Sequence, residues 1–492
     1  MKVCLTLGTV LLTSVSAFHR PQSLQTASSL HGRAAKAAGV SPVSSKRRAD
    51  QQDRLPNTPG SLAAALASTR SSSSVAMSST KYDVVVYGAT SYVGQRLCEY
   101  YLTTYGASPP TFKWAVAARS ESKLTALKER LASEIDAAAS ALPTILADSQ
   151  DDEAVERMVS QAKVIVTTVG PFAQYGSKLV AACAAAGVHC CDLTGESLWV
   201  KGVIDKHHEE AERTGAKIVP SCGFNSIPAD IGTLMMVDQM KRTNGIMPEN
   251  VRFYFRAAKG GVGGGTVASV LSIFELVWSG GKEVNRKMND PLLLTPPGAF
   301  GKAGSTGGLG YDSTAKSWTS MSVFASHDTK IVFRSAAMLG YPAGFRYNEV
   351  NGYKGLLKGF LPAVLSTVAV AIGGLFMLIP ITRSFIAKRF LPAPGEGPSK
   401  EVRDNGFFWI DFCASGKTKE GKEVVCRGKV GSDKGDGPYK ETGKMLAECG
   451  LCLALDDLES KKGGVLTTAV AMGMPLFDRL NKAGMTFKIV DK

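Results

Sequence analysis

Short apolar runs alternate with longer amphipathic stretches through residues 81–227. The first run, residues 84–87, is β-branched and aromatic, which is typical of a parallel strand buried on both faces. A helix is expected over residues 92–105. Further strands are expected at residues 111–118, 143–147, 163–169, 188–193 and 217–220. This alternation predicts an α/β fold with a Rossmann-type, doubly wound parallel sheet.

A glycine-containing turn follows the first run directly. Gly88 and Gly94 enclose Thr90, Ser91 and Tyr92. The first glycine allows a sharp turn and the approach of a diphosphate, and the second lets the new helix pack closely on the strand. The free N–H groups at the helix start would then face the phosphates. Ser91 stands where a middle glycine is usual, and an ordinary β–α turn remains the alternative.

A basic residue closes the second apolar run. Arg119 and Ser120 end it, and Lys123 follows one helical turn later. An acidic residue at this position binds the 2′-hydroxyl of NAD, whereas an arginine accommodates the 2′-phosphate of NADP. The sequence therefore predicts NADP(H) rather than NAD(H). A solvated arginine at the start of a surface helix is the alternative.

Several polar residues are expected at the carboxyl edge of the sheet. Gly170 and Pro171 end the fourth run, so we expect them beside the nicotinamide half of the cofactor. Tyr175 and Asp192 could donate or orient a proton there, although structural roles are the alternative for both. No catalytic residue is assigned.

A second, α+β domain is expected to begin near Pro228 and to continue to residue 492. Residues 251–257 alternate like a half-buried strand, and residues 260–265 form a glycine-rich entry to a helix over 266–278. Residues 415–418 resemble the end of a phosphate-binding P-loop. Because Asp411 occupies the required first glycine position, they are read as part of a hairpin turn.

An uncharged apolar segment, residues 361–381, lies within this second domain. As a helix it would be about 31 Å long, enough for a bilayer core. A single crossing would separate two halves of one fold, so the segment is predicted to associate with a membrane without spanning it. A re-entrant hairpin divided at Gly373-Gly374, an interfacial helix and a buried core helix remain open. Basic residues flank the segment: Lys354, Lys358, Arg383, Lys388 and Arg389.

The charge is unevenly distributed along the chain. The net charge is +14, and residues 1–80 carry half of it, with three Lys and six Arg against two Asp. No basic stripe with interleaved aromatic residues remains to suggest nucleic-acid binding.

The first 80 residues have the composition of a presequence. Lys2 precedes an apolar run over residues 3–15 that small residues close, and residues 18–80 are rich in Ser, Ala and Arg. This layout is similar to the bipartite presequences of secondary plastids. Secretion or residence in the endoplasmic reticulum is the alternative.

The ten cysteines do not indicate a disulfide framework in a chain of this length. Cys190 and Cys191 would point to opposite faces of one strand. Cys449 and Cys452 form a lone C-x-x-C pair in a helical pattern without a nearby histidine. Packed thiols are therefore predicted, and no metal site is expected.

Five motifs together give a family resemblance. They are Gly-Ala-Thr-x-x-x-Gly at 88–94, Ala-Arg-Ser at 118–120, Val-Gly-Pro-Phe at 169–172, Asp-Leu-Thr-Gly-Glu at 192–196 and Gly-Phe-Asn-Ser-Ile-Pro-Ala-Asp at 223–230. Their order resembles the saccharopine dehydrogenase-like oxidoreductases, a group that includes the trans-acting enoyl reductases. The likeness resumes at residues 391–398, 435–442 and 463–467.

The resemblance implies a dinucleotide site and a reductase activity. It places Gly88, Thr90, Ser91, Gly94 and Arg119 at the cofactor phosphates and Gly170-Pro171 at the reactive end. Asn225 replaces a commonly acidic residue, which puts a proton-transfer role there in doubt.

The leading hypothesis is an NADP(H)-dependent oxidoreductase that acts on a lipid-like or carrier-bound substrate at a membrane or lipid-droplet surface, with a homodimer as a further expectation. A nucleotide-binding scaffold without catalysis is one alternative. An amino-acid dehydrogenase is another, and it would require arginines such as Arg252, Arg256, Arg334 and Arg346 to converge on a polycarboxylate.

Overall fold

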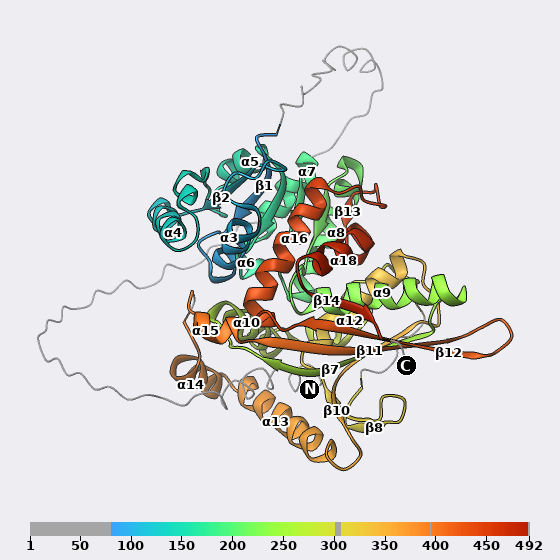
Figure 1. The fold of residues 1–492 in the computed structure, drawn as a ribbon. Coiled ribbons are helices and arrows are strands. Elements are labelled where there is room, and N and C mark those ends of the chain that lie inside the picture. The colour runs from blue at the N-terminus through green and yellow to red at the C-terminus, as the bar shows by residue number, and fades with distance from the viewer. Residues whose placement is uncertain (1–79, 301–306, 394, 491–492) are drawn as a thin grey trace, which may run out of the picture. The chain divides into compact units, whose positions relative to one another are not determined.

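The structure is a computed structural model that describes residues 80–300, 307–393 and 395–490 (Figure 1). The predicted presequence, residues 1–80, lies outside the described residues apart from Thr80. Two seven-stranded sheets organise the described part of the chain.

The first sheet is the predicted doubly wound sheet. Its strands are β1 (Tyr82–Tyr87), β2 (Trp114–Ala118), β3 (Thr144–Leu146), β4 (Ala162–Thr167), β5 (His189–Cys191) and β6 (Lys217–Val219), with β13 (Gly464–Val465) at one edge. The order is β13-β6-β5-β4-β1-β2-β3, and every neighbouring pair is parallel. This confirms the six predicted strands and the Rossmann order. The sequence did not predict β13, because its two residues carry no strand pattern of their own.

Helices cover both faces of this sheet. They are α3 (Tyr92–Tyr105), α4 (Glu121–Glu134), α5 (Asp152–Val159), α6 (Phe172–Tyr175), α7 (Ser177–Ala186), α8 (Ser197–Thr214) and the short helix η2 (Ala137–Ala141). Alternate residues of β1 enter different cores, since Val84 and Val86 belong to one apolar cluster and Val85 and Tyr87 to another. A strand that is buried on both faces therefore has a continuous apolar sequence.

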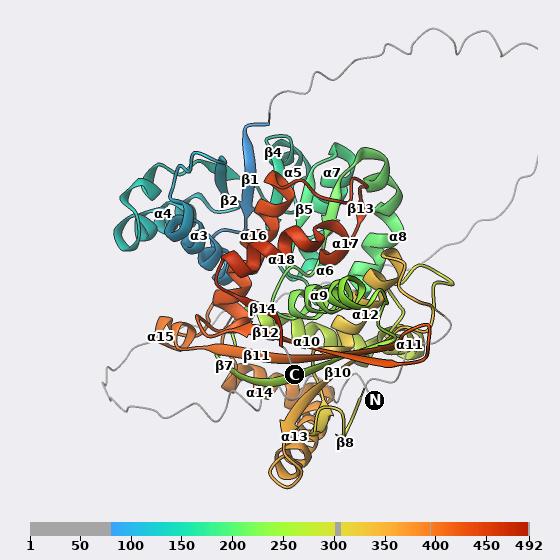
Figure 2. The same cartoon turned by 45° about the vertical axis from the view of Figure 1, so that its right-hand side comes forward.

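The second sheet is mixed. Its strands are β7 (Asn250–Lys259), β8 (Gly310–Asp312), β9 (Ser317–Met321), β10 (Arg346–Lys354), β11 (Phe407–Lys417), β12 (Glu423–Ser432) and β14 (Thr486–Ile489), in the order β14-β12-β11-β7-β10-β9-β8. Only β7 and β10 pair in parallel. Two helices, α9 (Ser226–Asn244) and α12 (Ala325–Met338), lie on one side of the sheet (Figure 2).

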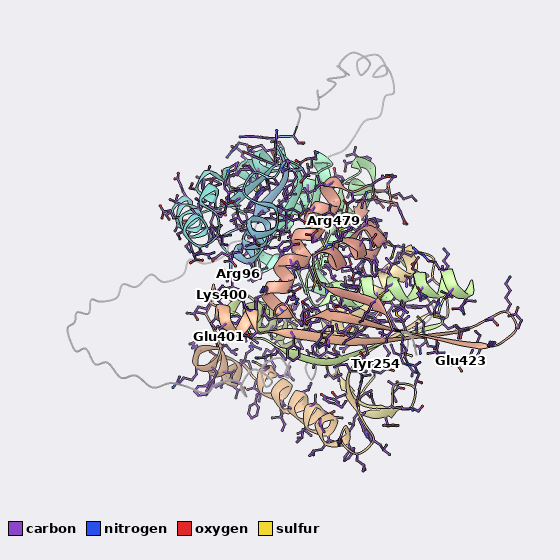
Figure 3. The ribbon with its side chains drawn as sticks, in the orientation of Figure 1. Arg96, Tyr254, Lys400, Glu401, Glu423 and Arg479 are labelled. Atoms are coloured by element: carbon purple, nitrogen blue, oxygen red, sulfur yellow. The ribbon has the colours of Figure 1, made fainter. Side chains whose placement is uncertain are left out.

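The C-terminal part of the chain returns to the first sheet. It contains α15 (Lys400–Asp404), η3 (Gly437–Glu441), α16 (Thr442–Leu455), α17 (Thr468–Ala471) and α18 (Gly473–Lys482). Helix α16 packs on α3, β1 and β4, and a Cβ at Gly450 would lie 2.5 Å from the side chain of Val166. Arg479 of α18 fixes the end of α16 through Glu448 at 3.1 Å and through Asp456 (Figure 3).

Most of the predicted apolar segment forms one helix, α13 (Phe360–Leu378), and its last two residues begin α14 (Pro380–Phe390). Helix α13 runs through Gly373-Gly374 without a break, so the re-entrant hairpin divided at this glycine pair is wrong. A buried core helix is also wrong, because only 22% of the most apolar part of α13 is buried. Its length and composition alone would allow it to cross a membrane.

Helix α13 is attached to the fold along one face. Ser366 Oγ lies 3.1 Å from Ser320 Oγ of β9, and the ring of Phe360 packs on Trp318 at 4.9 Å between centroids. Figures 1 and 2 show α13 beside β10, away from α9 and α12. Helices α10 (Gly264–Ser279) and α11 (Gly281–Asn289) share a small apolar cluster with it.

Candidate functional site

The two glycines of the β1–α3 turn lie where no side chain fits. Gly88 has φ +83°, and a Cβ on it would lie 2.7 Å from Thr168 Oγ1. A Cβ on Gly94 would lie 2.2 Å from the carbonyl oxygen of Gly88. At Gly94 the turn therefore brings backbone against backbone, which is the close helix–strand packing that a dinucleotide turn requires.

Ser91 has a structural reason to replace the usual glycine. It is the N-cap of α3, and its Oγ accepts a hydrogen bond from Gly94 N at 2.9 Å. Thr168 donates to the Gly88 carbonyl at 2.9 Å, which leaves the Ser91 hydroxyl to donate to Thr168 Oγ1 at 2.8 Å. Sequence reasoning missed Thr168, although its position just after a buried strand was a usable signal.

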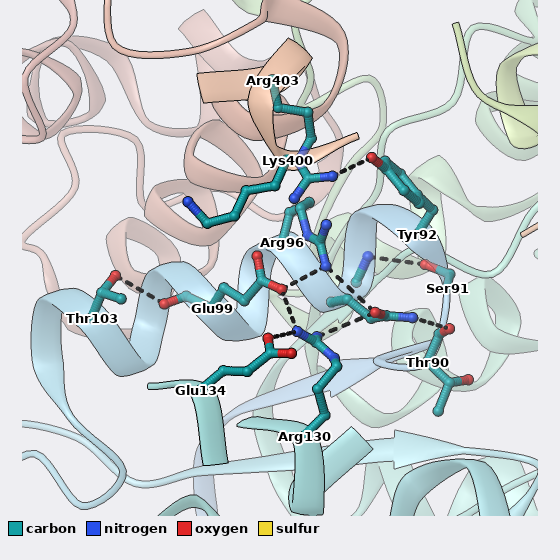
Figure 4. A network of polar contacts seen from close by, with 12 residues as sticks. Thr90, Ser91, Tyr92, Arg96, Glu99, Thr103, Arg130, Glu134, Lys400 and Arg403 are labelled. Atoms are coloured by element: carbon teal, nitrogen blue, oxygen red, sulfur yellow. Dashed lines mark hydrogen bonds and ion pairs between the residues drawn. The ribbon is translucent and has the colours of Figure 1, made fainter. Parts of the chain in front are cut away.

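Tyr92 turns its side chain away from the turn. Its hydroxyl donates to the carbonyl of Pro398 and accepts from Arg403 Nη1 at 2.6 Å, and its ring meets Tyr439 edge-on at 5.1 Å (Figure 4). Only the backbone of Tyr92 is then available to a phosphate. Thr90 is half-buried, and its carbonyl accepts from Gln95 Nε2 at 3.1 Å.

A network of ion pairs braces the first turns of α3. Arg96 contacts Glu99 at 2.5 Å, and Arg130 of α4 contacts Glu99 at 3.0 Å and Glu134 at 2.7 Å (Figure 4). These contacts hold α3 and α4 together below the turn.

Arg119 is exposed at the carboxyl end of β2. The neighbouring strand residue, Ala117, accepts from Gly88 N at 2.8 Å, so Arg119 lies close to the glycine turn. Across the described ranges, no hydrogen bond or ion pair engages its guanidinium. Ser120 is the N-cap of α4 and accepts from Lys123 N at 3.4 Å. An unpaired cation beside a dinucleotide turn fits a 2′-phosphate.

The Gly170-Pro171 turn is held by a buried carboxylate. Glu196 accepts from Phe172 N at 3.0 Å and from Ala173 N at 2.9 Å, which caps the short helix α6. Gly170 is exposed, and its peptide bond to Pro171 is cis. Tyr175, at the end of α6, is half-buried, and within the described segments no partner engages its hydroxyl.

Asp192 joins the loops that follow β5 and β6. It is buried, and its Oδ1 accepts from Thr194 N at 2.8 Å and Ser221 N at 3.1 Å. Burial raises the pKa of Asp192 to about 7. This arrangement supports a structural role; a role in proton transfer remains a prediction.

Helix α12 supplies two residues to the same edge that the sequence did not reveal. His327 lies between Ser197 Oγ at 2.7 Å and Ser221 Oγ at 2.9 Å, and burial lowers its pKa to about 3. The imidazole is therefore neutral. Its neighbour Asp328 accepts from Ser226 Oγ at 2.7 Å. A site assembled from residues about 100 positions apart leaves no local sequence signal.

The four arginines considered for a polycarboxylate substrate do not converge. Arg252 pairs with Asp312 at 2.9 Å, and Arg256 pairs with Asp411 at 2.8 Å. Arg334 donates to two backbone carbonyls, and Arg346 is exposed at the start of β10. Little in this arrangement favours an amino-acid substrate.

The eight buried cysteines of the described segments form no disulfide. Cys449 and Cys452 are buried, and burial raises the pKa of Cys449 to about 11. Residues 80–300, 307–393 and 395–490 contain no group of three or more His, Cys, Asp or Glu side chains that could hold a metal ion.

Comparison with known proteins gives one family match and a set of curated relatives. The model of the saccharopine dehydrogenase NADP binding domain matches residues 84–219. A trans-acting enoyl reductase from Mycobacterium bovis is 34% identical over 420 residues, which cover 82% of this chain and 97% of the relative. A relative from Mycobacterium tuberculosis, provisionally named as a trans-acting enoyl reductase, is 35% identical over 424 residues. These residues cover 83% of this chain and 97% of the relative.

A solved structure is also similar. The apo saccharopine dehydrogenase (L-Glu forming) from Saccharomyces cerevisiae matches with a TM-score of 0.46 and 11% identity, over 83% of this chain and 100% of that one.

Proposed function

The chain belongs to the saccharopine dehydrogenase-like oxidoreductases that include the trans-acting enoyl reductases, and from this premise we propose that it reduces a lipid-like or carrier-bound enoyl substrate at a membrane surface. Its cofactor is NADP(H). The observation that carries the proposal is the glycine turn beside the unpaired guanidinium of Arg119, because this pair of features suits a phosphorylated dinucleotide.

Different residues of the first sheet would bind different parts of the cofactor. The backbone N–H groups of Thr90 and Tyr92 would receive the diphosphate at the start of α3, where the first N–H groups have no intrahelical partner. Those of Gly88 and Ser91 already donate to Ala117 and Gly88, so these two residues would shape the turn around the phosphates. Arg119 and Ser120 would bind the ribose phosphate. When bound, the cofactor supplies the hydride, and the protein supplies orientation and a dry environment.

The loops after β4, β5 and β6 would shape the substrate side. Glu196 fixes the Gly170-Pro171 turn, and Asp192 fixes Ser221, so the three strand ends form one hydrogen-bonded edge. Tyr175 lies beside the Gly170-Pro171 turn, and its hydroxyl, which has no partner among the described residues, could reach a substrate.

The membrane part of the proposal is supported by α13. Its exposed side chains recur every three or four residues, as a stripe along one helix face; they are Leu361, Leu365, Val368, Ile372, Leu375 and Phe376. No acidic residue occurs between Glu349 and Glu396, whereas five cations do. An apolar stripe bordered by cations suits an anionic membrane surface.

The test of the activity is NADPH oxidation by the purified full-length protein with a panel of enoyl thioesters and enoyl lipids. Consumption of NADPH in step with loss of the conjugated double bond is expected. Binding of NADPH without consumption of any panel member would instead support the nucleotide-binding scaffold.

We also propose that residues 1–80 direct the protein to a plastid, with the endoplasmic reticulum or lipid droplets as the alternative destination. The proposal rests on an apolar run followed by a basic, Ser-rich and Ala-rich stretch. Fusion of residues 1–80 to a fluorescent protein would test it, and fluorescence confined to the endoplasmic reticulum would contradict plastid import.

A further inference from the structure

Helix α13 is fixed to the rest of the chain along its whole length. At its start, the ring of Phe360 packs on Trp318 of β9, and at its end Met377 shares an apolar cluster with Phe274 of α10. The exposed apolar stripe lies on the opposite side of the helix and faces away from these contacts. The buried residues of the helix recur along one side of it at helical spacing; they are Ala363, Val370, Gly374 and Met377.

This packing bears on how α13 could meet a membrane. A helix that crosses a bilayer is surrounded by lipid or by other spanning segments. The elements that hold α13 are β9 and α10, and no other helix in the described part of the chain is both long and apolar enough to cross. A crossing would therefore break the contacts of the buried side, whereas contact through the stripe alone leaves the fold unchanged.

The chain changes direction between α13 and α14. Pro380 is the first residue of α14, and a residue that precedes proline is disfavoured in the helical conformation. The Thr382 hydroxyl donates to the carbonyl of Ile379 at 3.0 Å, which fixes the bend. No residue of α14 is buried, and the rings of Phe385 and Phe390 are 62% and 66% exposed. Helix α14 thus adds exposed aromatic rings next to the end of α13.

The cations at both ends of α13 favour one orientation. A crossing helix would place the two groups of cations on opposite faces of the membrane. A helix that lies flat brings both groups to the headgroups of one leaflet, where each cation contributes about 1 kcal/mol of attraction to anionic lipid. Among them, only Lys354 forms an ion pair within the described ranges, with Asp411 at 3.3 Å. The five cations are Lys354, Lys358, Arg383, Lys388 and Arg389.

We propose that α13 and α14 dock the protein on one leaflet of an anionic phospholipid membrane, with α13 lying in the plane of the surface. The inference rests on the proposed function and deepens its membrane part, since it names the lipid class and the orientation. A second copy of this chain fits the surface less well, because two copies joined through α13 would bring the flanking cations of both together, and like charges in contact are costly.

The depth of single tryptophans in the membrane distinguishes the two orientations. The variants Leu361→Trp, Val368→Trp and Leu375→Trp place the probe at exposed positions that are about 10 Å apart along the stripe. Each full-length variant is bound to phosphatidylglycerol vesicles, and quenching by lipids brominated at different acyl positions is measured. The signal of the unmodified protein, which has five tryptophans, is subtracted.

A flat helix predicts the same shallow depth for all three probes, about 5–10 Å into the interface. A crossing helix would place the probe at position 368 near the bilayer centre and the other two near its surfaces, and that result would overturn the proposal. Leu146→Trp is the control, because Leu146 is 49% exposed on β3 of the first sheet, and its probe should not be quenched.

Vesicle composition and oligomeric state test the choice of membrane as the occupant. Binding to vesicles of phosphatidylcholine alone is expected to be roughly tenfold weaker or more. Equal binding to the two lipids would contradict the role of the cations. A dimer in solution in which no probe is quenched would identify a second copy as the occupant and would overturn the proposal.

These measurements require neither NADPH nor turnover. If the three probes are equally shallow but NADPH is never oxidised, the proposed reductase fails and the docking surface stands. If soluble enoyl thioesters are reduced but vesicles are not bound, the reductase stands and the docking surface fails.

Discussion

The turn between β1 and α3 and the outer side of α13 leave very different surfaces exposed. At the turn, the packing is so tight that Gly88 and Gly94 have no room for a Cβ, and Ser91 and Thr168 satisfy one another. Along α13, large apolar side chains face outward, and Leu361 is 61% exposed. The packing of the first region is completed by its own chain, whereas the second leaves a row of apolar side chains exposed.

Because the turn is tightly packed and the outer side of α13 is exposed, the two regions should respond differently to substitution. At the turn, a change of one methyl group should alter both folding and cofactor binding, because the neighbours cannot move. On α13, polar substitutions should leave the fold intact and weaken only the proposed association with a membrane.

Gly94→Ala should have the largest effect. The added Cβ would lie 2.2 Å from the Gly88 carbonyl, so the helix must shift away from the turn. We expect a loss of roughly 3 kcal/mol in the free energy of unfolding, together with loss of measurable NADPH binding. Urea denaturation and cofactor titration measure the two effects.

Gly202→Ala is the matched control, because no atom lies within 4 Å of a Cβ at that helical position. It should be neutral or slightly stabilising. If Gly94→Ala behaved like Gly202→Ala, the turn would not be as closely packed as described.

Arg119→Ala should affect the cofactor alone. Removal of the guanidinium should weaken NADPH binding by roughly 10- to 100-fold and leave NADH binding unchanged. Fluorescence titration with the two cofactors measures this difference. Arg157→Ala, which removes another exposed arginine from the same domain, should change neither affinity. Equal affinity of the unmodified protein for NADPH and NADH would mean that Arg119 does not bind the 2′-phosphate.

The double variant Leu365→Asp and Leu375→Asp tests the other region. Both side chains are 59% exposed, so we expect unchanged thermal unfolding and NADPH binding, but roughly tenfold weaker binding to anionic vesicles. Vesicle co-sedimentation measures the loss. Leu146→Asp, a 49% exposed position on β3, should sediment like the unmodified protein. If the double variant still sedimented fully with the vesicles, α13 would not be the part of the protein that binds the membrane.

Tyr92→Phe tests the link between the two regions, because Tyr92 begins α3 and its hydroxyl binds the segment that follows α14. Loss of its contacts with Pro398 and Arg403 should lower the free energy of unfolding by about 1 kcal/mol and weaken NADPH binding only slightly. Tyr311→Phe, at a position that is 41% exposed, should change neither quantity. A large loss of cofactor binding in Tyr92→Phe would mean that the two regions are not independent.

The first sheet was predictable because its signals are local. The central strands β1, β2 and β4 contain continuous apolar runs, and the turn after β1 is marked by two glycines, so most of the order of strands and helices could be inferred from adjacent residues alone. The position of Arg119 could be predicted for the same reason, since strand ends in a parallel sheet meet at one edge.

The remaining features depend on distant residues. His327 reaches Ser197 and Ser221 from a helix more than 100 residues away, and Tyr92 binds residues near position 400. Gly373-Gly374 suggested a break in the apolar segment, because glycine disfavours helix, yet packing against α10 and β9 holds the helix together. In each case tertiary contacts decide the outcome, and no local pattern reports them.

The strand β13 has a consequence for biosynthesis. It is made from residues 464 and 465, yet it covers the edge of β6, which was synthesised almost 250 residues earlier. Until the ribosome has passed this point, the nucleotide-binding half would display an unpaired strand edge, a common starting point for aggregation. Nascent or truncated chains that end before residue 464 should therefore need a chaperone, whereas the finished chain closes the edge itself.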